Sequence, residues 1–335
     1  MVRTRKLGRR LAAAGVLALA VLAAGAGSAL AGPAPGSPVP APTPGRLLLG
    51  WSFDPLVTVG LLAAAIAYLQ ARRRLVAGGV AWPRRRTAYF LSGIGALALA
   101  LLSPVEAYDT VLFSVHVAQH MLLTMVAAPL LALGAPVTLA LRVAKGRTRR
   151  RMVRVLHSLP LRVLGNPLVA WVLFTLSLYG LYFSPLFDLT LRQPLVHDLV
   201  HLHFLGAGLL FWWPVVGLDP SRWRLPHIAR LLFVFVMVPF HAFLGVAIMN
   251  SGRVLAPTLE TFQRSWGPTP LADQQVGGAI LWGAGDLIAL GAVLGILVSW
   301  ASYEEKVVAV REDRRLARER AAGRTVRPVT RPPVP

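Results

Sequence analysis

The sequence has no cysteine among its 335 residues, which excludes a disulfide framework and any metal site built on thiolates. Charged residues are scarce at 15%, whereas a soluble domain of this size carries about 25%. Acidic residues are the scarcer kind, with 14 Asp and Glu against 35 Lys and Arg. Apolar residues make up 55% of the chain, and the mean hydropathy is +0.59. The composition therefore favours a membrane protein in which any soft-metal chemistry uses His, Met or carboxylate ligands.

Residues 1–31 are typical of a secretory signal peptide, because a basic start precedes an apolar stretch that ends in small residues. Ala29 and Ala31 fit the A-x-A pattern, so we expect cleavage after Ala31. An uncleaved anchor helix is the alternative interpretation. Residues 32–46 are rich in proline and show no periodicity, which predicts an extended, solvated extracytoplasmic spacer.

Seven apolar runs follow, each long enough to cross a hydrocarbon core of about 30 Å as a helix. They cover residues 55–71, 87–103, 113–133, 166–183, 195–216, 229–249 and 276–299. We therefore predict an all-α fold, a polytopic membrane helix bundle with seven transmembrane helices after a cleavable signal peptide. The membrane domain spans residues 47–300, and residues 301–335 form a basic cytoplasmic tail.

Basic residues predict the orientation of this bundle. The loops after the first, third and fifth runs and the tail together hold 26 Lys and Arg, and the segments on the other side hold four. Because basic loops resist translocation, the side with 26 is expected to be cytoplasmic. The chain is then a multi-pass protein of the cell (plasma or inner) membrane with its N-terminus outside and its C-terminus inside. The net charge of +21 indicates contact with membrane lipid and no nucleic-acid partner.

Histidines gather in the predicted extracytoplasmic half, which holds six of the eight. His116 and His120 are four residues apart on one span, and His197 and His201 repeat that spacing on another. Residues four apart share one face of a helix, so two such pairs at equal depth can supply four imidazoles to one metal site. His241 lies about 12 Å deep in the sixth span at helical rise.

The other histidines are weaker candidates. His203 is two residues from His201 and points to a different face, while His157 and His227 fall in basic cytoplasmic loops. For every histidine the alternative is a buried imidazole that is hydrogen-bonded across helices.

Imidazole suits Cu, Zn, Fe and Ni alike, so the histidines alone do not choose the metal. Met121 and Met125 follow the first pair, and thioethers near imidazoles favour copper, Cu(I) in particular. Three carboxylates lie near or within the spans, and each could orient a histidine, relay protons or tie helices together. They are Asp198, Asp273 and Asp286. The glycines around the last of these allow close helix contact; they are Gly277, Gly278, Gly283 and Gly285.

The segment HVAQHMLLTMVAAPLLALGAP (116–136) resembles the multi-spanning CtaG family of cytochrome c oxidase assembly factors. The resemblance continues through WSFDP (51–55), LSP (102–104), HDLVHLHFLGAGLLFWWPVVGLDP (197–220), PFHAFLGVAIM (239–249) and DQQVGGAILWGAGD (273–286). It implies a caa3-type assembly factor and metallochaperone that is not an enzyme. Its expected partners are a cytochrome c oxidase subunit and a copper donor protein. The resemblance also carries over His116, His120, His197, His201 and His241 as copper ligands, and Asp273 and Asp286 as polar positions without an assigned role.

Two other classes of function remain open at this point. Histidines on facing helices are the usual axial ligands of a membrane haem b electron-transfer protein. A copper or proton-coupled transporter would instead need polar groups that continue into the cytoplasmic half of the membrane. In this sequence only Asp286 lies as deep as the midplane.

Overall fold

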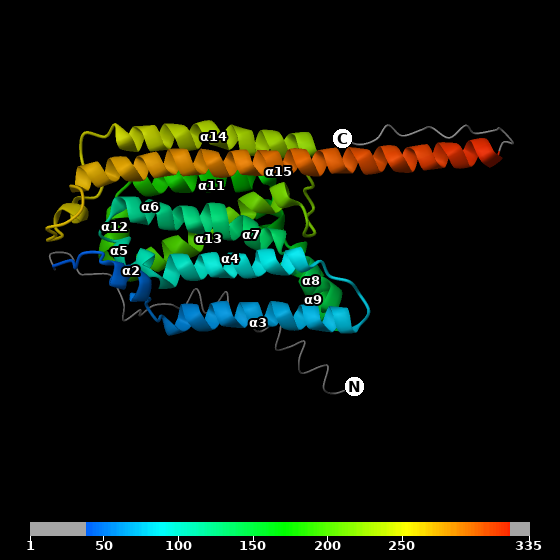
Figure 1. Cartoon of the computed structure of the whole chain (residues 1–335), viewed down its shortest axis with the longest axis horizontal. Helices are drawn as coiled ribbons and strands as arrows, with labels where there is room; N and C mark the ends of the chain where they lie inside the picture. Colours follow the sequence, from blue (N-terminus) through cyan, green and yellow to red (C-terminus); the bar gives the residue numbers. More distant parts are fainter. Residues whose placement is uncertain (1–37, 322–335) are drawn as a thin grey trace.

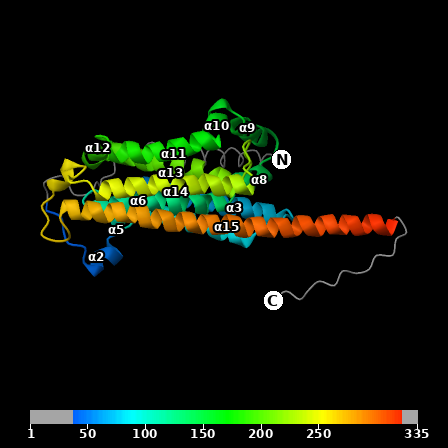
Figure 2. The same ribbon diagram turned by 90° about the horizontal axis from the view of Figure 1, so that it is seen from above.

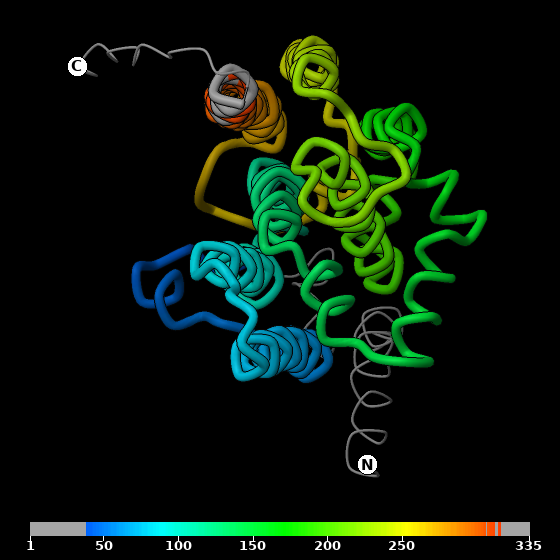
Figure 3. Tube along the Cα trace, turned by 90° about the vertical axis from the view of Figure 1, so that its right-hand side faces the viewer, coloured from blue at the N-terminus to red at the C-terminus, as the bar shows by residue number. Residues whose placement is uncertain are grey.

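The computed structural model describes residues 38–321, and every regular element in that range is a helix. The predicted signal peptide lies outside the described residues. The long helices are α3 (Pro55–Ala77), α4 (Arg84–Leu102), α6 (Phe113–Met121), α11 (Pro167–Tyr182), α13 (Pro194–Val216), α14 (His227–Met249) and α15 (Pro270–Ala321). They lie side by side as a bundle (Figures 1 and 3). The short helices are α2 (Pro44–Leu49), α5 (Pro104–Tyr108), α7 (Ala128–Leu133), α8 (Pro136–Val143), α9 (Gly146–Leu156), α10 (Leu159–Leu164) and α12 (Leu186–Arg192).

Within residues 38–321, six helices are long and apolar enough to cross a membrane, so this part of the chain has the all-helical fold of a membrane protein. The fourth predicted span differs from the others. Helix α11 has 16 residues, about 24 Å at helical rise, and α12 follows it at an angle of 69°. The break occurs at Ser184, whose hydroxyl accepts the Leu186 N–H where α12 begins. The prediction of seven spans is thus confirmed for six, and the seventh requires α11 and α12 to count as one broken span.

The bundle has two chemically different ends. Helices α2, α5 and α12 lie at one end, together with the starts of α6, α13 and α15 (Figure 1). We call this the histidine end. The predicted basic loops at residues 72–86, 142–162 and 222–230 lie at the opposite end, which we call the basic end. Helix α15 continues beyond the basic end to Ala321 (Figures 1 and 2), which confirms the prediction that the tail begins as a charged helix.

A π-helical turn, η1 (Leu122–Ala127), interrupts the span that begins with α6. The N–H of Ala128 donates to Leu123, five residues back, instead of to the carbonyl of Thr124. Pro129 has no N–H to take over that carbonyl. The indole N–H of Trp212 on α13 donates to the Thr124 oxygen at 2.9 Å, so the free carbonyl becomes a link between the two helices.

Glycines allow several helices of the bundle to approach one another closely. A Cβ atom at Gly208 of α13 would lie 3.0 Å from the Cα atom of Thr124. Between α14 and α15, a Cβ at Gly245 would meet the Gly278 oxygen at 2.6 Å, and between α15 and α6, a Cβ at Gly277 would meet the Phe113 ring at 2.3 Å. Close contact at these glycines confirms the role predicted for Gly277 and Gly278. These backbones approach closely because no side chain intervenes.

Part of the predicted solvated spacer is packed against the histidine end, which corrects that expectation. Val39 is only 6% exposed, and its N–H donates to the Gln263 oxygen at 3.2 Å. The Val39 oxygen accepts the indole N–H of Trp266 at 2.7 Å, and the Pro40 oxygen accepts the Tyr108 hydroxyl at 3.1 Å. An apolar side chain with satisfied backbone groups is stable in a buried position, even in a proline-rich segment.

Candidate metal centre

The two predicted histidine pairs face each other from α6 and α13 near the histidine end. The ring centroids of His116 and His120 are 4.2 Å apart, and those of His197 and His201 are 4.3 Å apart. Across the two helices, His116 lies 5.5 Å from His197, and His120 lies 5.5 Å from His201. All four side chains are buried. The i, i+4 spacing thus brings four imidazoles into one cluster, as the sequence predicts.

The separations of these four rings can be compared with those of imidazoles that share one metal ion. A nitrogen–metal bond of about 2.1 Å, with the ring centroid about 1.1 Å beyond the nitrogen, places the centroids of two rings on one ion about 4.5–5.2 Å apart. The separations of 4.2–5.5 Å lie on either side of this range. The four rings are therefore close neighbours, but their separations do not by themselves place all four on one ion.

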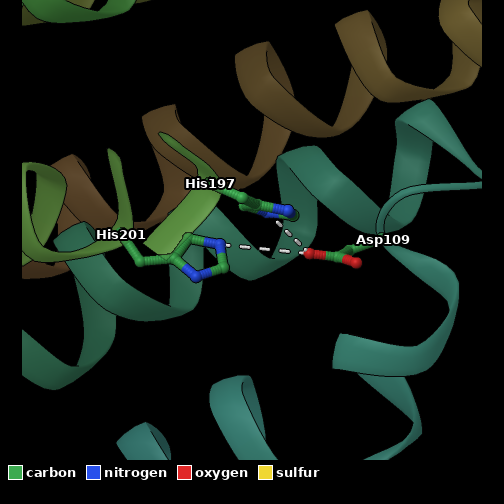
Figure 4. A group of neighbouring side chains, drawn as sticks. All are labelled: Asp109, His197 and His201. Atoms are coloured by element: carbon green, nitrogen blue, oxygen red, sulfur yellow. Dashed lines mark ion pairs between the residues drawn. The ribbon is translucent and has the colours of Figure 1, made fainter. Parts of the chain in front are cut away.

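Asp109, just after α5, is a member of the cluster that sequence reasoning missed. Figure 4 shows its carboxylate directed at two histidines of α13. Oδ2 lies 3.0 Å from Nε2 of His197 and 3.9 Å from Nε2 of His201. The shorter contact has the distance of an ion pair, but the atoms are not aligned as a hydrogen bond. One ligand atom from each of the three residues lies within 4.8 Å of the others, so together they could hold a metal ion.

The ring nitrogens of His116 and His120 are the clearest chemical signal in the cluster. Both nitrogens of both rings are buried, and none has a hydrogen-bond partner within residues 38–321. Buried polar atoms are nearly always hydrogen-bonded, because an unpaired one costs about 1–3 kcal/mol. Four such atoms on adjacent rings leave hydrogen-bonding capacity that the described residues do not use.

Asp273 positions the helix that carries the first pair. It is 2% exposed at the start of α15, and its carboxylate accepts both the N–H and the hydroxyl of Ser114. Ser114 is the second residue of α6, where backbone N–H groups have no partner within the helix. The carboxylate thus caps α6 two residues before His116, and this contact gives Asp273 a structural role that the sequence did not show.

Carboxylates surround the cluster on the side of the histidine end. Glu106 accepts a hydrogen bond from the Gln119 side chain at 2.6 Å and interacts electrostatically with Asp109 and Asp198. Asp198, half-buried beside His197, interacts with His197 and Asp109 as well. Glu106 and Asp198 therefore form an acidic rim next to the histidines, and their carboxyl oxygens are of the kind that can bind a cation weakly.

Aromatic side chains pack against the histidines of the cluster. Phe204 stacks on His120 with centroids 4.5 Å apart, and Phe187 lies 4.9 Å from His116. Tyr182 lies 6.4 Å from His116, and its buried hydroxyl has no hydrogen-bond partner among the described residues. Low-polarity walls strengthen any interaction between the histidines and a cation.

His241 lies apart from the four-histidine cluster. Its ring stacks on Phe174 at 6.0 Å, and within the described residues no ring contact joins it to another histidine. Both of its nitrogens are buried without a hydrogen-bond partner in that same part of the chain. Its backbone neighbour across the helix contact is Gly285, where a Cβ would lie 2.6 Å from Nδ1 of His241. The metal-ligand role of His241 stays a prediction.

The remaining candidates lie in several places. Met121 and Met125 are buried on the span of the first pair, and Met121 points about 100° away from its neighbour His120. Asp286 is half-buried on α15, and its Oδ1 atom has no hydrogen-bond partner among residues 38–321. His203 is exposed and bonds the Ser177 hydroxyl at 2.6 Å, which confirms that it faces away from the cluster.

Of the two histidines assigned to the basic loops, His157 is exposed and His227 is half-buried. Nδ1 of His157 lies 2.8 Å from the Val153 oxygen at the end of α9. His227 begins α14 and lies against Trp300 and Tyr303 of α15.

The chain is thus a helical membrane protein in which buried histidines of α6 and α13 face each other next to Asp109. The family model described as cytochrome c oxidase caa3 assembly factor (Caa3_CtaG) matches residues 65–302. The chain therefore belongs to this family, and the resemblance found in the sequence is confirmed.

Similar curated proteins come from mycobacteria. Uncharacterized proteins of Mycobacterium bovis and Mycobacterium tuberculosis are each 39% identical over 284 residues, and one of Mycobacterium leprae is 36% identical over 281 residues. Each match covers 82% of this chain but 42% of the relative, so the chain spans less than half the length of these relatives. No solved structure matches the chain.

Proposed function

We propose that this protein is a cytochrome c oxidase assembly factor that binds copper at its histidine cluster and helps to insert it into the oxidase. The observation that carries the proposal is the set of four buried, unpartnered nitrogens on His116 and His120, facing His197 and His201 across two helices. Family membership supplies the link to oxidase assembly. Copper is the cargo, and the protein performs no turnover chemistry of its own.

The donor set fits copper. Imidazole binds copper well, and the carboxylate of Asp109 adds an anionic oxygen that offsets part of the charge of the ion. Zinc accepts the same donors, so the preference for copper depends on the family. A chaperone must also release its cargo, and the acidic rim next to the cluster provides weak sites along the way to the surface.

The charge distribution supports an extracytoplasmic position for the cluster. The cluster and the basic loops lie at opposite ends of the bundle. Since basic loops resist translocation, the basic end is the cytoplasmic one under this proposal, and copper reaches the histidines from outside. An oxidase subunit in the same membrane and an extracytoplasmic copper donor are the proposed partners.

The proposal is tested in a strain that lacks the protein. Wild type and the His116→Ala/His120→Ala variant are expressed in that strain, and the copper content and activity of the purified oxidase are measured. We expect the wild type to restore both and the variant to restore neither at equal abundance. Full restoration by the variant would contradict the role of the cluster. A Soret band in the purified wild-type protein would instead support a haem-binding function.

A further inference from the structure

Gln119 is a fully buried amide on α6, between the histidines of the first pair, and it makes three hydrogen bonds. Its Nε2 atom donates to the Ala100 backbone oxygen at 3.0 Å and to Oε2 of Glu106 at 2.6 Å. Its Oε1 atom lies 2.9 Å from Nε2 of His201 on the facing helix α13. This glutamine therefore connects both histidine helices and the end of α4.

The environment of the amide determines which of its ends faces His201. A backbone carbonyl has no proton to donate, so the atom next to the Ala100 oxygen must be the NH₂ group. The amide oxygen then faces His201, and an oxygen can only accept. Nε2 of His201 must therefore carry the proton in this contact. Asp109 lies 3.9 Å from the same nitrogen, which is too far to compete as a hydrogen-bond acceptor.

We propose that Gln119, anchored by Glu106 and the Ala100 carbonyl, is a positioning residue that holds His201 in its Nε2–H tautomer, so that Nδ1 of His201 is the atom that binds the metal. A neutral imidazole has one nitrogen with a free lone pair for a metal. The hydrogen bond that the other nitrogen donates determines which of the two nitrogens this is. Such a partner also fixes the rotation of the ring and raises the basicity of the ligating nitrogen. The metal part of this inference rests on the proposed function, but the tautomer does not.

The tautomer is measured first, in the full chain without metal. Protein with ¹⁵N-labelled histidine is purified, and the ring ¹⁵N signals of His201 are assigned by their loss in His201→Ala. We expect Nε2 to be protonated and Nδ1 to be bare in the wild type. In Gln119→Leu, whose side chain cannot accept a hydrogen bond from Nε2, we expect that preference to disappear. A protonated Nδ1 in the wild type, or an unchanged tautomer in Gln119→Leu, would overturn the proposal.

Gln274→Leu is the matched control, because Gln274 is also fully buried at the histidine end but bonds only backbone groups of residues 248, 253 and 255. It should reduce stability to a similar extent and leave the His201 signals unchanged. A change of the His201 tautomer in Gln274→Leu would show that loss of stability alone produces the effect, and this too would overturn the proposal.

Copper titrations then test the ligand role, with Cu(I) and Cu(II) added separately. Loss of a histidine's outer partner typically lowers metal affinity about 10- to 100-fold, so Gln119→Leu should bind copper that much more weakly than Gln274→Leu. Equal affinities of the two variants would refute the positioning role in metal binding. If the wild type binds no copper at all, the proposed function is wrong. The tautomer measurement does not depend on copper binding and still tests the role of Gln119.

Discussion

Asp273 offers a sharp test of how the fold positions the metal ligands, because it caps α6 without touching a histidine. Its carboxylate accepts two hydrogen bonds from Ser114, and a bond to a charged group contributes about 1.5–3 kcal/mol. The N–H bond is long at 3.3 Å, so we expect Asp273→Ala to lower the free energy of unfolding by about 2–4 kcal/mol. The first turn of α6 should also loosen two residues before His116. We therefore expect copper affinity to fall about 10-fold or more, as for other residues that orient metal ligands.

The bundle contains a matched control for this substitution. Asp219, before α14, caps α8 near the basic end by accepting the N–H groups of Val137 and Thr138 at 3.3 and 2.6 Å. Asp219→Ala should lower stability by a similar amount and leave copper affinity unchanged. Stability is measured by reversible unfolding in detergent, and affinity by competition with a copper chelator. Equal copper affinities of the two variants would refute the idea that the cap of α6 positions the site.

Three further substitutions test the packing and the limits of the site. Trp212→Phe removes the hydrogen bond to the Thr124 oxygen, and the buried carbonyl left without its partner should lower the free energy of unfolding by about 1–3 kcal/mol in the same unfolding assay. Gly278→Leu should disrupt the contact between α14 and α15 and cost several times more stability than Gly283→Leu, since a Cβ at position 283 meets no described atom within 4 Å. His203→Ala should leave copper stoichiometry unchanged, and a lost copper ion there would contradict the assignment.

The helical part of the fold could be predicted because each span is an apolar run of sufficient length. The exception is the region of α11 and α12: the predicted run at 166–183 matches α11, but α12, which carries Asp188 and Arg192, follows at an angle of 69°. Hydropathy reports composition and not direction, so the bend was not visible in the sequence. The π-helical turn at η1 was equally hidden, although Pro129 in the following helix provides a local cause.

The two histidine pairs could be predicted because an i, i+4 spacing depends only on helix geometry. Asp109 and Gln119 could not, since their roles depend on how a short loop and a second helix meet the first. The available signal was weak but present: Glu106 and Asp109 lie in an otherwise apolar segment just before His116. His241 shows a different limit: a position in the same predicted half of the membrane does not by itself bring a histidine to the cluster, and among the described residues its ring contacts Phe174 and no other histidine.

The most direct test of the central claim is the copper content of the purified protein, measured by elemental analysis after loading and removal of free metal. We expect about one copper per wild-type chain, and most of it lost in the His116→Ala/His120→Ala variant. The matched control is His157→Ala/His227→Ala, which removes two histidines outside the cluster and should retain the copper. An unchanged copper content in the first double variant would contradict the proposed site.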